Sequence, residues 1–468
     1  MAPLSWVNLL STERMRKLQS GPDSQKLDKE KRSEWERDYG RTIYSAPFRR
    51  LKQKAQVFPL EHGDYVRTRL THSIEVSSVA EDIASQLTRT IPDLQNLEEE
   101  ERKAVPLVAA TCGLIHDLGN PPFGHAGELA IQTWFEDRIR ESPEFLEGLN
   151  PQQASDFRKF EGNAHSLRII SNLCLLIDDY GLNYTCGTFS AARKYLPPSN
   201  KADDKDLNHA NTKPGFFWSE RDIISIAEAK TGTSECRHPL AFLVEAADDL
   251  VYCVVDLEDG IKQRVLDWHL LSDYLRQKCS GSSAYEKIMK AVDGADMTGF
   301  SRSERDEALI QLFRISAISE FAIAAKELFS KRYESIMSGK YEKELLLDEE
   351  SEARPLIEAC KDYARANLYK APKILKLEIQ GRRVLHELMD LLWEGVKDVS
   401  ADKPPSGTKK YPDKIYQLIS DNYRRVFLKR LKLDPSNEKY HKLQLVTDYV
   451  AGMTDTFACR LHKDLTNE

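Results

Sequence analysis

The sequence predicts an all-α protein. Apolar residues recur at helical spacing along most of the 468 residues, which is the pattern of amphipathic helices packed on a core. Alternating β-branched runs bounded by hairpin turns are missing, apart from a weak strand candidate at 184–189. The hydrophobic content of 41% and the charged content of 30% are ordinary for a soluble globular protein. We therefore expect a helical core with additional helices on its N- and C-terminal sides.

Several segments carry this helical pattern, and turn-forming residues mark their ends. Ile74, Val79, Ile83 and Leu87 give the first segment one apolar face, and the stretch 119–122, with Gly and Pro, ends the second. The same spacing predicts helices at 72–90, 104–118, 126–140, 162–178, 238–266, 306–336, 373–396, 413–431 and 440–462. Three polar stretches rich in helix breakers are predicted loops, at 195–215, 279–304 and 398–412.

The charge balance and the cysteine pattern narrow the functional class. A formal net charge of −7 argues against a general coating of nucleic acid. The N-terminus lacks the basic and apolar regions of a signal peptide, and no stretch approaches the roughly 18 consecutive apolar residues of a membrane span. The 8 cysteines show no CxxC spacing and mostly lie in apolar segments, as buried thiols do in a reducing compartment. We therefore expect a cytoplasmic protein without a membrane partner.

A His-Asp pair at the end of an apolar segment is the main candidate for a metal site. His116 and Asp117 precede the 119–122 break, His72 opens an earlier helix, and Asp248 lies within a long apolar helix. An isolated His-Asp dipeptide or a lone helical histidine is commonly structural, but a carboxylate among apolar residues is costly to bury without a partner. Together these side chains would leave positions open for water and phosphate oxygens on a divalent cation, with Mg or Mn favoured and Co, Ni, Fe or Zn also suitable.

The helix around Asp248 carries a line of polar side chains. Glu245, Asp248, Tyr252 and Asp256 follow one another at three- or four-residue spacing, so they share one face. Acidic stripes are usually solvated, and that interpretation stays open. Bulky apolar residues at most other positions favour a second interpretation, in which the stripe forms the wall of a polar pocket.

With these ligand candidates assembled, the chain resembles the HD superfamily of metal-dependent phosphohydrolases. Longer strings resemble its deoxyguanosinetriphosphate triphosphohydrolase (dGTPase) family, and the block from His116 to His125, ending in Gly-Asn-Pro-Pro-Phe-Gly-His, is the most specific of them. The matching strings lie at 45–58, 69–73, 116–128, 160–164, 245–249 and 452–455, which together span nearly the whole chain. One departure is His165, where relatives usually carry Gln.

The resemblance implies both a reaction and a catalytic centre. A deoxynucleoside triphosphate, with dGTP favoured, is expected to be hydrolysed to deoxynucleoside and inorganic triphosphate by attack of water at the α-phosphorus. His125 and Glu128 would orient or activate the water and handle protons, and residues three apart on a helix do share a face. The metal ligands implied are His72, His116, Asp117 and Asp248.

The resemblance also implies contacts for each part of the substrate. Arg69 would meet the α-phosphate with its forked donors, because a guanidinium matches phosphate oxygens. Lys213 matches a phosphate-contacting lysine of the family, and Asn163 would hydrogen-bond phosphate or water.

Recognition of the sugar and the base follows from the same resemblance. Gln56 and Asp256 match positions that contact the 3′-hydroxyl, and Tyr252 matches a ring that packs against C2′ and leaves no room for a ribose hydroxyl. Glu378 could read the N1 and N2 donors of guanine, although an exposed helical glutamate explains this residue equally well.

The domain organisation and the partners are expectations of the same kind. The HD phosphohydrolase domain is predicted at 66–272, after an N-terminal segment at 1–65 packed on the core. A C-terminal helical region at 273–468 is expected to complete the pocket and the oligomer contacts. Relatives imply a homo-oligomer such as a hexamer, with single-stranded DNA as a candidate effector. The alternatives are a broad-specificity HD-domain dNTPase or nucleotidase, and a nucleotide- or DNA-sensing module.

Overall fold

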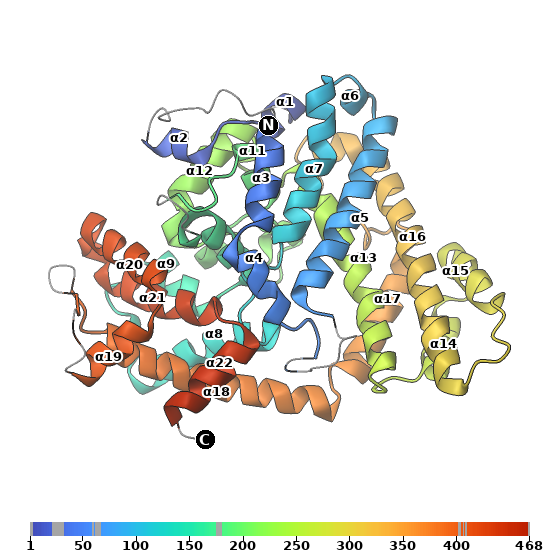
Figure 1. The fold of residues 1–468 in the computed structure, drawn as a ribbon. Coiled ribbons are helices and arrows are strands. Elements are labelled where there is room, and N and C mark those ends of the chain that lie inside the picture. Colours follow the sequence, from blue (N-terminus) through green and yellow to red (C-terminus); the bar gives the residue numbers. More distant parts are fainter. Residues whose placement is uncertain are drawn as a thin grey trace.

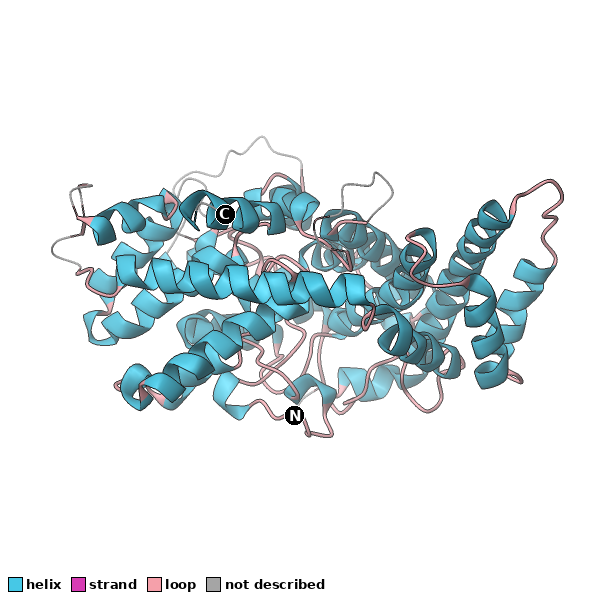
Figure 2. Cartoon of the chain, turned by 90° about the horizontal axis from the view of Figure 1, so that it is seen from below, coloured by secondary structure: helices cyan, strands magenta, loops and turns pink. Residues whose placement is uncertain are grey.

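The protein is built from helices and the loops that join them (Figures 1 and 2). The computed structural model describes residues 3–20, 32–58, 60, 67–174, 180–400, 404–405, 407 and 410–466. These residues form 22 α-helices and no β-strand, with isolated β-bridges such as the one between Ala55 and Thr68. The all-α prediction is therefore confirmed.

The helices of the N-terminal half include the two that flank the His-Asp pair and the segment after it. They are α1 (Trp6–Leu9), α2 (Met15–Ser20), α3 (Glu34–Ile43), α4 (Ala46–Arg50), α5 (Arg69–Thr90), α6 (Pro92–Gln95), α7 (Glu99–Ile115), α8 (Gly124–Glu141), α9 (Pro151–Arg158), α10 (Gly162–Arg168) and α11 (Cys186–Ala191).

The helices of the C-terminal half include the long helices α13, α16 and α18. The full set is α12 (Arg221–Thr231), α13 (Pro239–Lys262), α14 (Trp268–Cys279), α15 (Ser283–Asp293), α16 (Arg302–Met337), α17 (Arg354–Tyr363), α18 (Pro372–Val396), α19 (Tyr411–Leu418), α20 (Asp421–Leu433), α21 (Glu438–Ala451) and α22 (Asp455–Thr466). Single π-helical turns follow α10 at Ile169–Leu173 and α17 at Ala364–Leu368.

Several predicted boundaries are wrong, and each error has a local cause. The strand candidate at 184–189 makes one bridge, at Thr185, which then caps α11 through its side chain. The predicted helix 440–462 is two helices separated at 452–454, and 413–431 is two helices separated at 419–420. The predicted loop 279–304 contains α15, whereas 195–215 holds only short 3₁₀ turns. In the predicted helix 162–178, residues 175–179 lie outside the described part.

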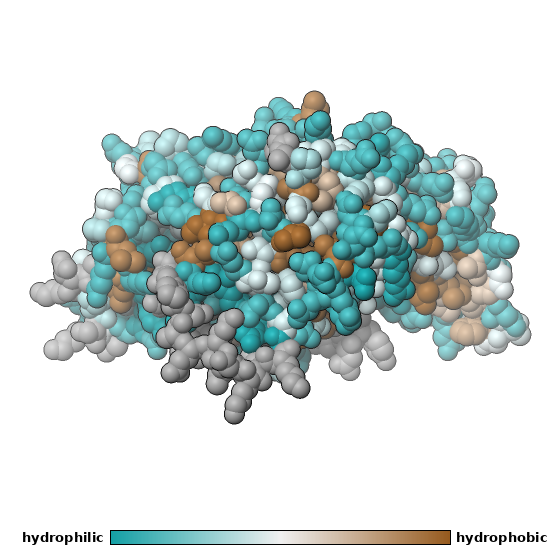
Figure 3. Space-filling view, turned by 90° about the horizontal axis from the view of Figure 1, so that it is seen from above, coloured by the Kyte–Doolittle hydropathy of each residue, from teal (hydrophilic) through white to brown (hydrophobic). Residues whose placement is uncertain are grey.

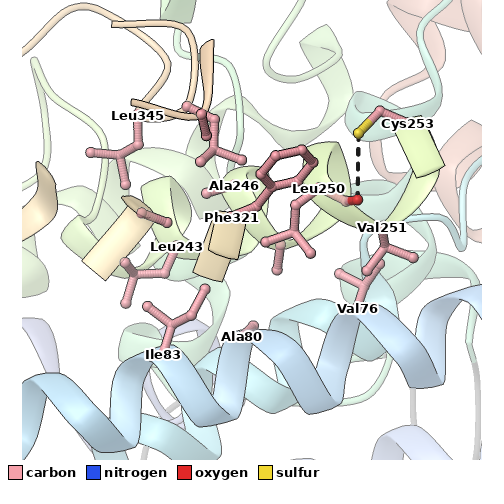
Figure 4. Packing of buried hydrophobic residues seen from close by; sticks show 14 of the residues in the cluster. Val76, Ala80, Ile83, Leu243, Ala246, Leu250, Val251, Cys253, Phe321 and Leu345 are labelled. Atoms are coloured by element: carbon pink, nitrogen blue, oxygen red, sulfur yellow. Dashed lines mark hydrogen bonds between the residues drawn. The ribbon is translucent and has the colours of Figure 1, made fainter. Parts of the chain in front are cut away.

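Two apolar clusters hold the fold together. In the first, α5 packs against α7 and α13, and α13 packs against α16, as their adjacent ribbons in Figure 1 show. Figure 4 shows Val76 and Ile83 of α5 facing Leu243 and Leu250 of α13, with Phe321 of α16 beside them. The second cluster joins α8, α18 and α21. Burying each of these large side chains stabilises the fold by about 1.5–3 kcal/mol.

The turn between α7 and α8 is fixed by close backbone approaches. A Cβ on Gly119 would lie 2.0 Å from the Gly162 carbonyl oxygen, and one on Gly127 would lie 1.9 Å from the Pro122 carbonyl oxygen. Phe123 takes a left-handed conformation with φ of 65°, and its N–H donates to Oδ1 of Asp455 at 3.0 Å. The glycines of this motif therefore allow α8 to start directly beside the His-Asp pair.

The long helix α16 is the one described helix whose length and composition would allow it to cross a membrane. Its most apolar window has a mean hydropathy of 1.5, and 28% of that window is buried. Phe313, Ala317 and Phe321 lie in the first apolar cluster against α13, so core packing accounts for part of this hydropathy. The face of the molecule in Figure 3 is mainly hydrophilic, with small separate hydrophobic patches.

Candidate active site

A cavity of about 520 Å³ lies where α5, α7, α8 and α13 meet the segments that follow α4 and α11. This volume is within the range of small-molecule sites. Every predicted substrate-contact residue lines it, together with three predicted metal ligands and His125. The predicted residues in its wall are Gln56, Arg69, His116, Asp117, His125, Asn163, Lys213, Asp248, Tyr252, Asp256 and Glu378. The acidic stripe of α13 therefore faces a pocket and is not a solvated surface.

The four predicted metal ligands come together from α5, α13 and the C-terminal end of α7. Ligand atoms of His72, His116 and Asp117 lie within 4.8 Å of one another. Nε2 of His72 lies 3.1 Å from Oδ1 of Asp248, and Nε2 of His116 lies 3.5 Å from the same oxygen. A second carboxylate oxygen, Oδ1 of Asp117, lies 3.6 Å from Nε2 of His116.

This group fits a divalent cation. Nε2 of His116 is buried and has no hydrogen-bond partner among the described residues, while its Nδ1 lies 2.7 Å from the Gly113 carbonyl oxygen. That second contact orients the ring as backbone carbonyls do for metal-bound histidines. Two imidazole nitrogens facing two carboxylates form a donor set that Mn, Fe, Co, Ni or Zn accepts, and Mg accepts its carboxylate part.

Electrostatics keep both carboxylates ionised. Burial disfavours the charged form of Asp117, but Arg69 and His116 outweigh it and hold the pKa of this carboxyl at about 2. Burial likewise opposes ionisation of Asp248, and His116 and His72 hold its pKa well below the usual range. Conversely, the two carboxylates outweigh burial and raise the pKa of His116 to about 9. A metal ion would replace that proton.

Arg69 links the metal group to the rest of the cavity. Its Nη1 donates to Oδ2 of Asp117 at 2.6 Å, and its Nε has no hydrogen-bond partner among the described residues although it is buried. Asn120 donates to the other oxygen of Asp117 through its side-chain amide. The buried Lys54 in turn donates to the Asn120 carbonyl. The guanidinium therefore keeps free donor capacity toward the cavity.

His125 and Glu128 form a hydrogen-bonded pair on the first turns of α8. Nδ1 of His125 lies 2.7 Å from Oε2 of Glu128, and the Gly162 N–H donates to Oε1 of the same carboxylate at 2.8 Å. The hydrogen bond with Glu128 raises the pKa of His125 above its usual value. The imidazole is exposed to the cavity while the carboxylate is buried behind it. The pair is thus arranged as an exposed proton carrier held by a buried anion.

At the end of the acidic stripe away from the metal group, the cavity wall carries the side chains of Asp256 and Gln56. Tyr369 donates its hydroxyl hydrogen to Oδ2 of Asp256 at 2.6 Å, and Oδ1 of Asp256 is buried with no partner among the described residues. Burial raises the pKa of Asp256 to about 7. Oε1 of Gln56 is similarly buried and without a partner in the described chain. Tyr252 lies between this end and the metal group on α13, and the Lys361 ammonium is 5.2 Å from its ring centre.

Two lysines bring positive charge to the part of the cavity wall formed by the segment after α11. Lys213 is half-exposed, with its Nζ 4.0 Å from Oε1 of Glu161, and that oxygen also accepts from Nδ2 of Asn163 at 2.9 Å. Nζ of Lys213 lies 5.8 Å from the Tyr195 ring centre, and Lys194, next to Tyr195 in the chain, is half-buried. Lys194 and Tyr195 both line the cavity. This wall, together with Arg69, can receive a polyanion.

Four polar residues of the cavity wall are not among the site residues predicted from the sequence. Lys194 and Tyr195 follow the short helix α11, and Tyr369 follows α17, so helical periodicity gave no sign of them. A Lys-Tyr pair one residue before Pro197-Pro198 could have indicated a fixed, charged loop start. Asn120 is part of the Gly-Asn-Pro-Pro string, and the string by itself does not indicate that its side chain supports Asp117.

The unusual His165 is not part of the cavity wall. It is fully buried on α10, its Nδ1 lies 2.9 Å from the Gly119 carbonyl oxygen, and its Nε2 lies 3.6 Å from Oδ1 of Asp448. It therefore supports the turn that carries the His-Asp pair. Glu378 is half-buried on the first half of α18, and this partial burial raises its pKa.

Comparison with known proteins agrees with this site. Residues 69–159 match the HD domain and residues 413–464 match a phosphohydrolase-associated domain. The chain is 34% identical to a deoxyguanosinetriphosphate triphosphohydrolase-like protein of Listeria monocytogenes, over 99% of both chains. It is 30% identical to the deoxyguanosinetriphosphate triphosphohydrolase of Enterobacter sp., over 98% of both chains, and 29% identical to that of Klebsiella pneumoniae, over 91% of this chain and 92% of the relative.

The HD match covers the helices that carry His72, His116, Asp117, His125 and Glu128, and HD domains are metal-dependent phosphohydrolases. The similarity extends over nearly the whole chain, so it includes the segments that complete the cavity. The chain therefore belongs to the deoxyguanosinetriphosphate triphosphohydrolase family of HD-domain phosphohydrolases.

Proposed function

We propose that this protein hydrolyses dGTP to deoxyguanosine and inorganic triphosphate. The observation that carries the proposal is that one cavity brings together a group of metal ligands, the His125–Glu128 pair and a positively charged wall. The names of the Enterobacter and Klebsiella relatives support the choice of substrate.

His72, His116, Asp117 and Asp248 would hold the divalent metal, with Mg or Mn as the first candidates. When bound, such an ion polarises phosphoryl oxygens and lowers the pKa of water, which favours nucleophilic attack. The protein then needs only to position the α-phosphate and to supply a proton to the leaving oxygen. Arg69 is placed for the first task because it lines the cavity and donates to the predicted metal ligand Asp117.

The proposed reaction needs one proton donor. Water attacks the α-phosphorus and gives up one proton to solvent as the new P–O bond forms. The bond from that phosphorus to the 5′ oxygen breaks, and the 5′ oxygen gains a proton to leave as a hydroxyl. We assign this role to His125, because its hydrogen bond with Glu128 raises its pKa above the usual value and so favours the protonated ring that can donate. The β- and γ-phosphates would lie against Lys194, Lys213 and Asn163.

The acidic stripe supports a proposal for the sugar and the base. The unpartnered oxygens of Gln56 and Asp256 would contact the 3′-hydroxyl, and the Tyr252 ring between them and the metal group would pack on C2′. An extra 2′-hydroxyl would collide with that ring. Glu378 at the cavity rim would accept hydrogen bonds from guanine N1 and N2.

Product analysis tests this function directly. Purified protein would be incubated with each of the four dNTPs and Mg or Mn, with and without single-stranded DNA, and the phosphate products separated. The proposal predicts intact triphosphate and a preference for dGTP. Stepwise release of orthophosphate or pyrophosphate would contradict it, equal turnover of all dNTPs would indicate a broad dNTPase, and binding without turnover would indicate a sensing module.

Three further properties are proposed on the strength of the family alone. We propose a cytoplasmic homo-oligomer, with a hexamer as the state to test first, and single-stranded DNA as the effector to include in assays. The predicted domain boundaries, 1–65, 66–272 and 273–468, also stay predictions.

A further inference from the structure

A second cluster of titratable side chains lies beside the cavity, away from the metal group. Nε2 of His209 lies 2.8 Å from Oε1 of Glu344 and 3.2 Å from Oε1 of Glu245. Glu245 belongs to the wall of the cavity on α13, Glu344 follows α16, and His209 lies in the loop 195–215. One imidazole thus joins three segments that are distant in the sequence.

The charged groups around this cluster determine whether the His209 imidazole is protonated. Glu245 also faces Arg237, whose Nη1 is 2.6 Å from its Oε2, and Lys194, whose Nζ is 3.6 Å from its Oε1. The Tyr195 ring lies 5.7 Å from the His209 ring. Burial opposes protonation of His209, but the two glutamates outweigh it and raise its pKa to about 9. Among the described residues, Glu245 has other cations near it, whereas His209 is the one cation within ion-pair distance of Glu344.

Backbone hydrogen bonds connect His209 and its loop to residues next to the cavity wall. The His209 N–H donates to the Glu342 carbonyl at 3.0 Å, and its own carbonyl accepts from Oγ1 of Thr212 at 2.8 Å. Within the loop, the Leu196 N–H donates to the Ala210 carbonyl at 2.8 Å. His209 is therefore coupled on one side to Lys194 and Tyr195, and on the other to Lys213.

We propose that the His209 imidazolium is a positioning residue: by bridging Glu245 and Glu344 it clamps the loop 195–215 so that the phosphate-facing side chains stay on the cavity wall. This inference rests on the proposed function, since it takes the ligand of that wall to be a polyphosphate. The positive charge of the His209 ring matters more for this role than the shape of the ring. A neutral side chain would leave Glu344 without a cation and would weaken the join between the loop and the segment after α16.

The test compares His209→Gln, which keeps a hydrogen-bond donor without charge, with His209→Lys, which keeps the charge. His269→Gln is the matched control, because His269 is an exposed histidine on α14 outside the cavity. The first measurement is calorimetric binding of inorganic triphosphate to the full chain with Mg. We expect His209→Gln to weaken triphosphate binding about tenfold, because the loop would then hold its binding-competent position about a tenth of the time. His209→Lys should recover most of this loss.

A second measurement keeps the inference separate from the proposed function. Trypsin cleavage after Lys205, in the same loop, should accelerate about tenfold in His209→Gln and stay at the parent rate in His209→Lys and the control. The fragments are identified by mass, because His209→Lys adds a trypsin site at position 209 that must be counted separately. With dGTP, KM should rise in His209→Gln while kcat changes little. In the parent, triphosphate affinity should fall as pH rises through about 9, and in His209→Lys it should not.

Several outcomes would overturn the clamp. Equal triphosphate affinity and equal trypsin sensitivity in the parent and His209→Gln would show that the ion pairs of His209 do not hold the loop 195–215 in place. Titration with Zn or Mn that finds one more bound ion in the parent than in His209→Gln would show that the cluster is a metal site instead. If the parent neither binds triphosphate nor hydrolyses dGTP, the proposed function fails, and the trypsin experiment still decides the clamp.

Discussion

Nε2 of His72 on α5 lies 3.1 Å from Oδ1 of Asp248 on α13, although 176 positions separate the two residues. His72 is almost fully buried, and the apolar contact of α5 with α13 brings the two helices together. The metal group is therefore formed by core packing and not by a local loop. A change in either side chain should affect the site without unfolding the helices that carry it.

Replacing Asp248 by Asn should abolish metal-dependent activity. The change keeps the shape of the side chain but removes the anion that faces His72 and His116, so metal affinity and turnover of dGTP should each fall at least about 100-fold. The measurements are metal content by mass spectrometry and triphosphate release. Asp222→Asn, on an exposed position of α12, is the matched control and should behave as the parent. Normal turnover in Asp248→Asn would refute the ligand assignment.

Replacing Glu128 by Gln should move the pH profile as well as the rate. The hydrogen bond from Glu128 raises the pKa of His125, and a proton donor loses activity as pH rises through its pKa. In Glu128→Gln we therefore expect kcat to fall about 10²–10⁴-fold and its alkaline limb to begin at lower pH. Metal content should stay unchanged, because neither residue belongs to the metal group. An unchanged alkaline limb would remove His125 from the role of proton donor.

Adding one methyl group at Gly127 should disrupt the turn beside the His-Asp pair. The new Cβ would lie 1.9 Å from the Pro122 carbonyl oxygen, which is backbone and cannot rotate away. We expect Gly127→Ala to lower the free energy of unfolding by at least about 2 kcal/mol and to lose activity, measured by denaturant unfolding and dGTP turnover. Gly40→Ala on α3 is the control, since its Cβ would come no closer than 3.6 Å to any neighbour. Equal stability of the two variants would contradict the packing argument.

His238, which caps α13, should make the fold sensitive to acid. Burial lowers its pKa to about 4, while Nε2 lies 3.1 Å from the Leu9 carbonyl oxygen and Nδ1 accepts from the Leu240 N–H. The unfolded chain protonates this ring near pH 6.5, so the contribution to the free energy of unfolding is complete above about 6.5. It should fall by about 3 kcal/mol as pH drops through 4.

The variant His238→Gln isolates this contribution. Its amide can still donate to Leu9 and accept from Leu240, but it does not titrate. The free energy of unfolding, measured from pH 7.5 to pH 4, should therefore decline less steeply in His238→Gln than in the parent. His269→Gln, at an exposed position, should keep the parent slope. Identical slopes in all three proteins would show that His238 does not carry the acid sensitivity.

Replacing Glu378 by Gln should reduce the preference for guanine. If Glu378 accepts hydrogen bonds from N1 and N2, its loss should raise KM for dGTP about 10–100-fold and leave KM for dATP nearly unchanged. Glu394→Gln, further along α18 and outside the cavity, is the control. The same KM for dGTP in both variants would mean that Glu378 is an exposed helical glutamate without a role in base choice.

The sequence alone determined the fold class and the family. Apolar spacing of three and four residues predicted the long helices α5, α7, α13, α16 and α18, because each buries one continuous face. The same pattern missed short helices such as α3 and α11, and it joined α21 to α22, since a brief break at 452–454 leaves the apolar period almost intact. The glycines around the His-Asp pair also pointed correctly to a tight turn.

Only the tertiary structure decided which predicted side chains share a cavity and what else lies there. Lys194, Tyr195 and Tyr369 come from loop starts and helix ends without any periodic signal, and they reach the cavity only because α11 and α17 pack near α13. The contact of His209 with Glu245 and Glu344 joins three distant segments in the same way. Spacing along a chain reports the faces of a helix, whereas contacts between helices depend on how those faces pack in three dimensions.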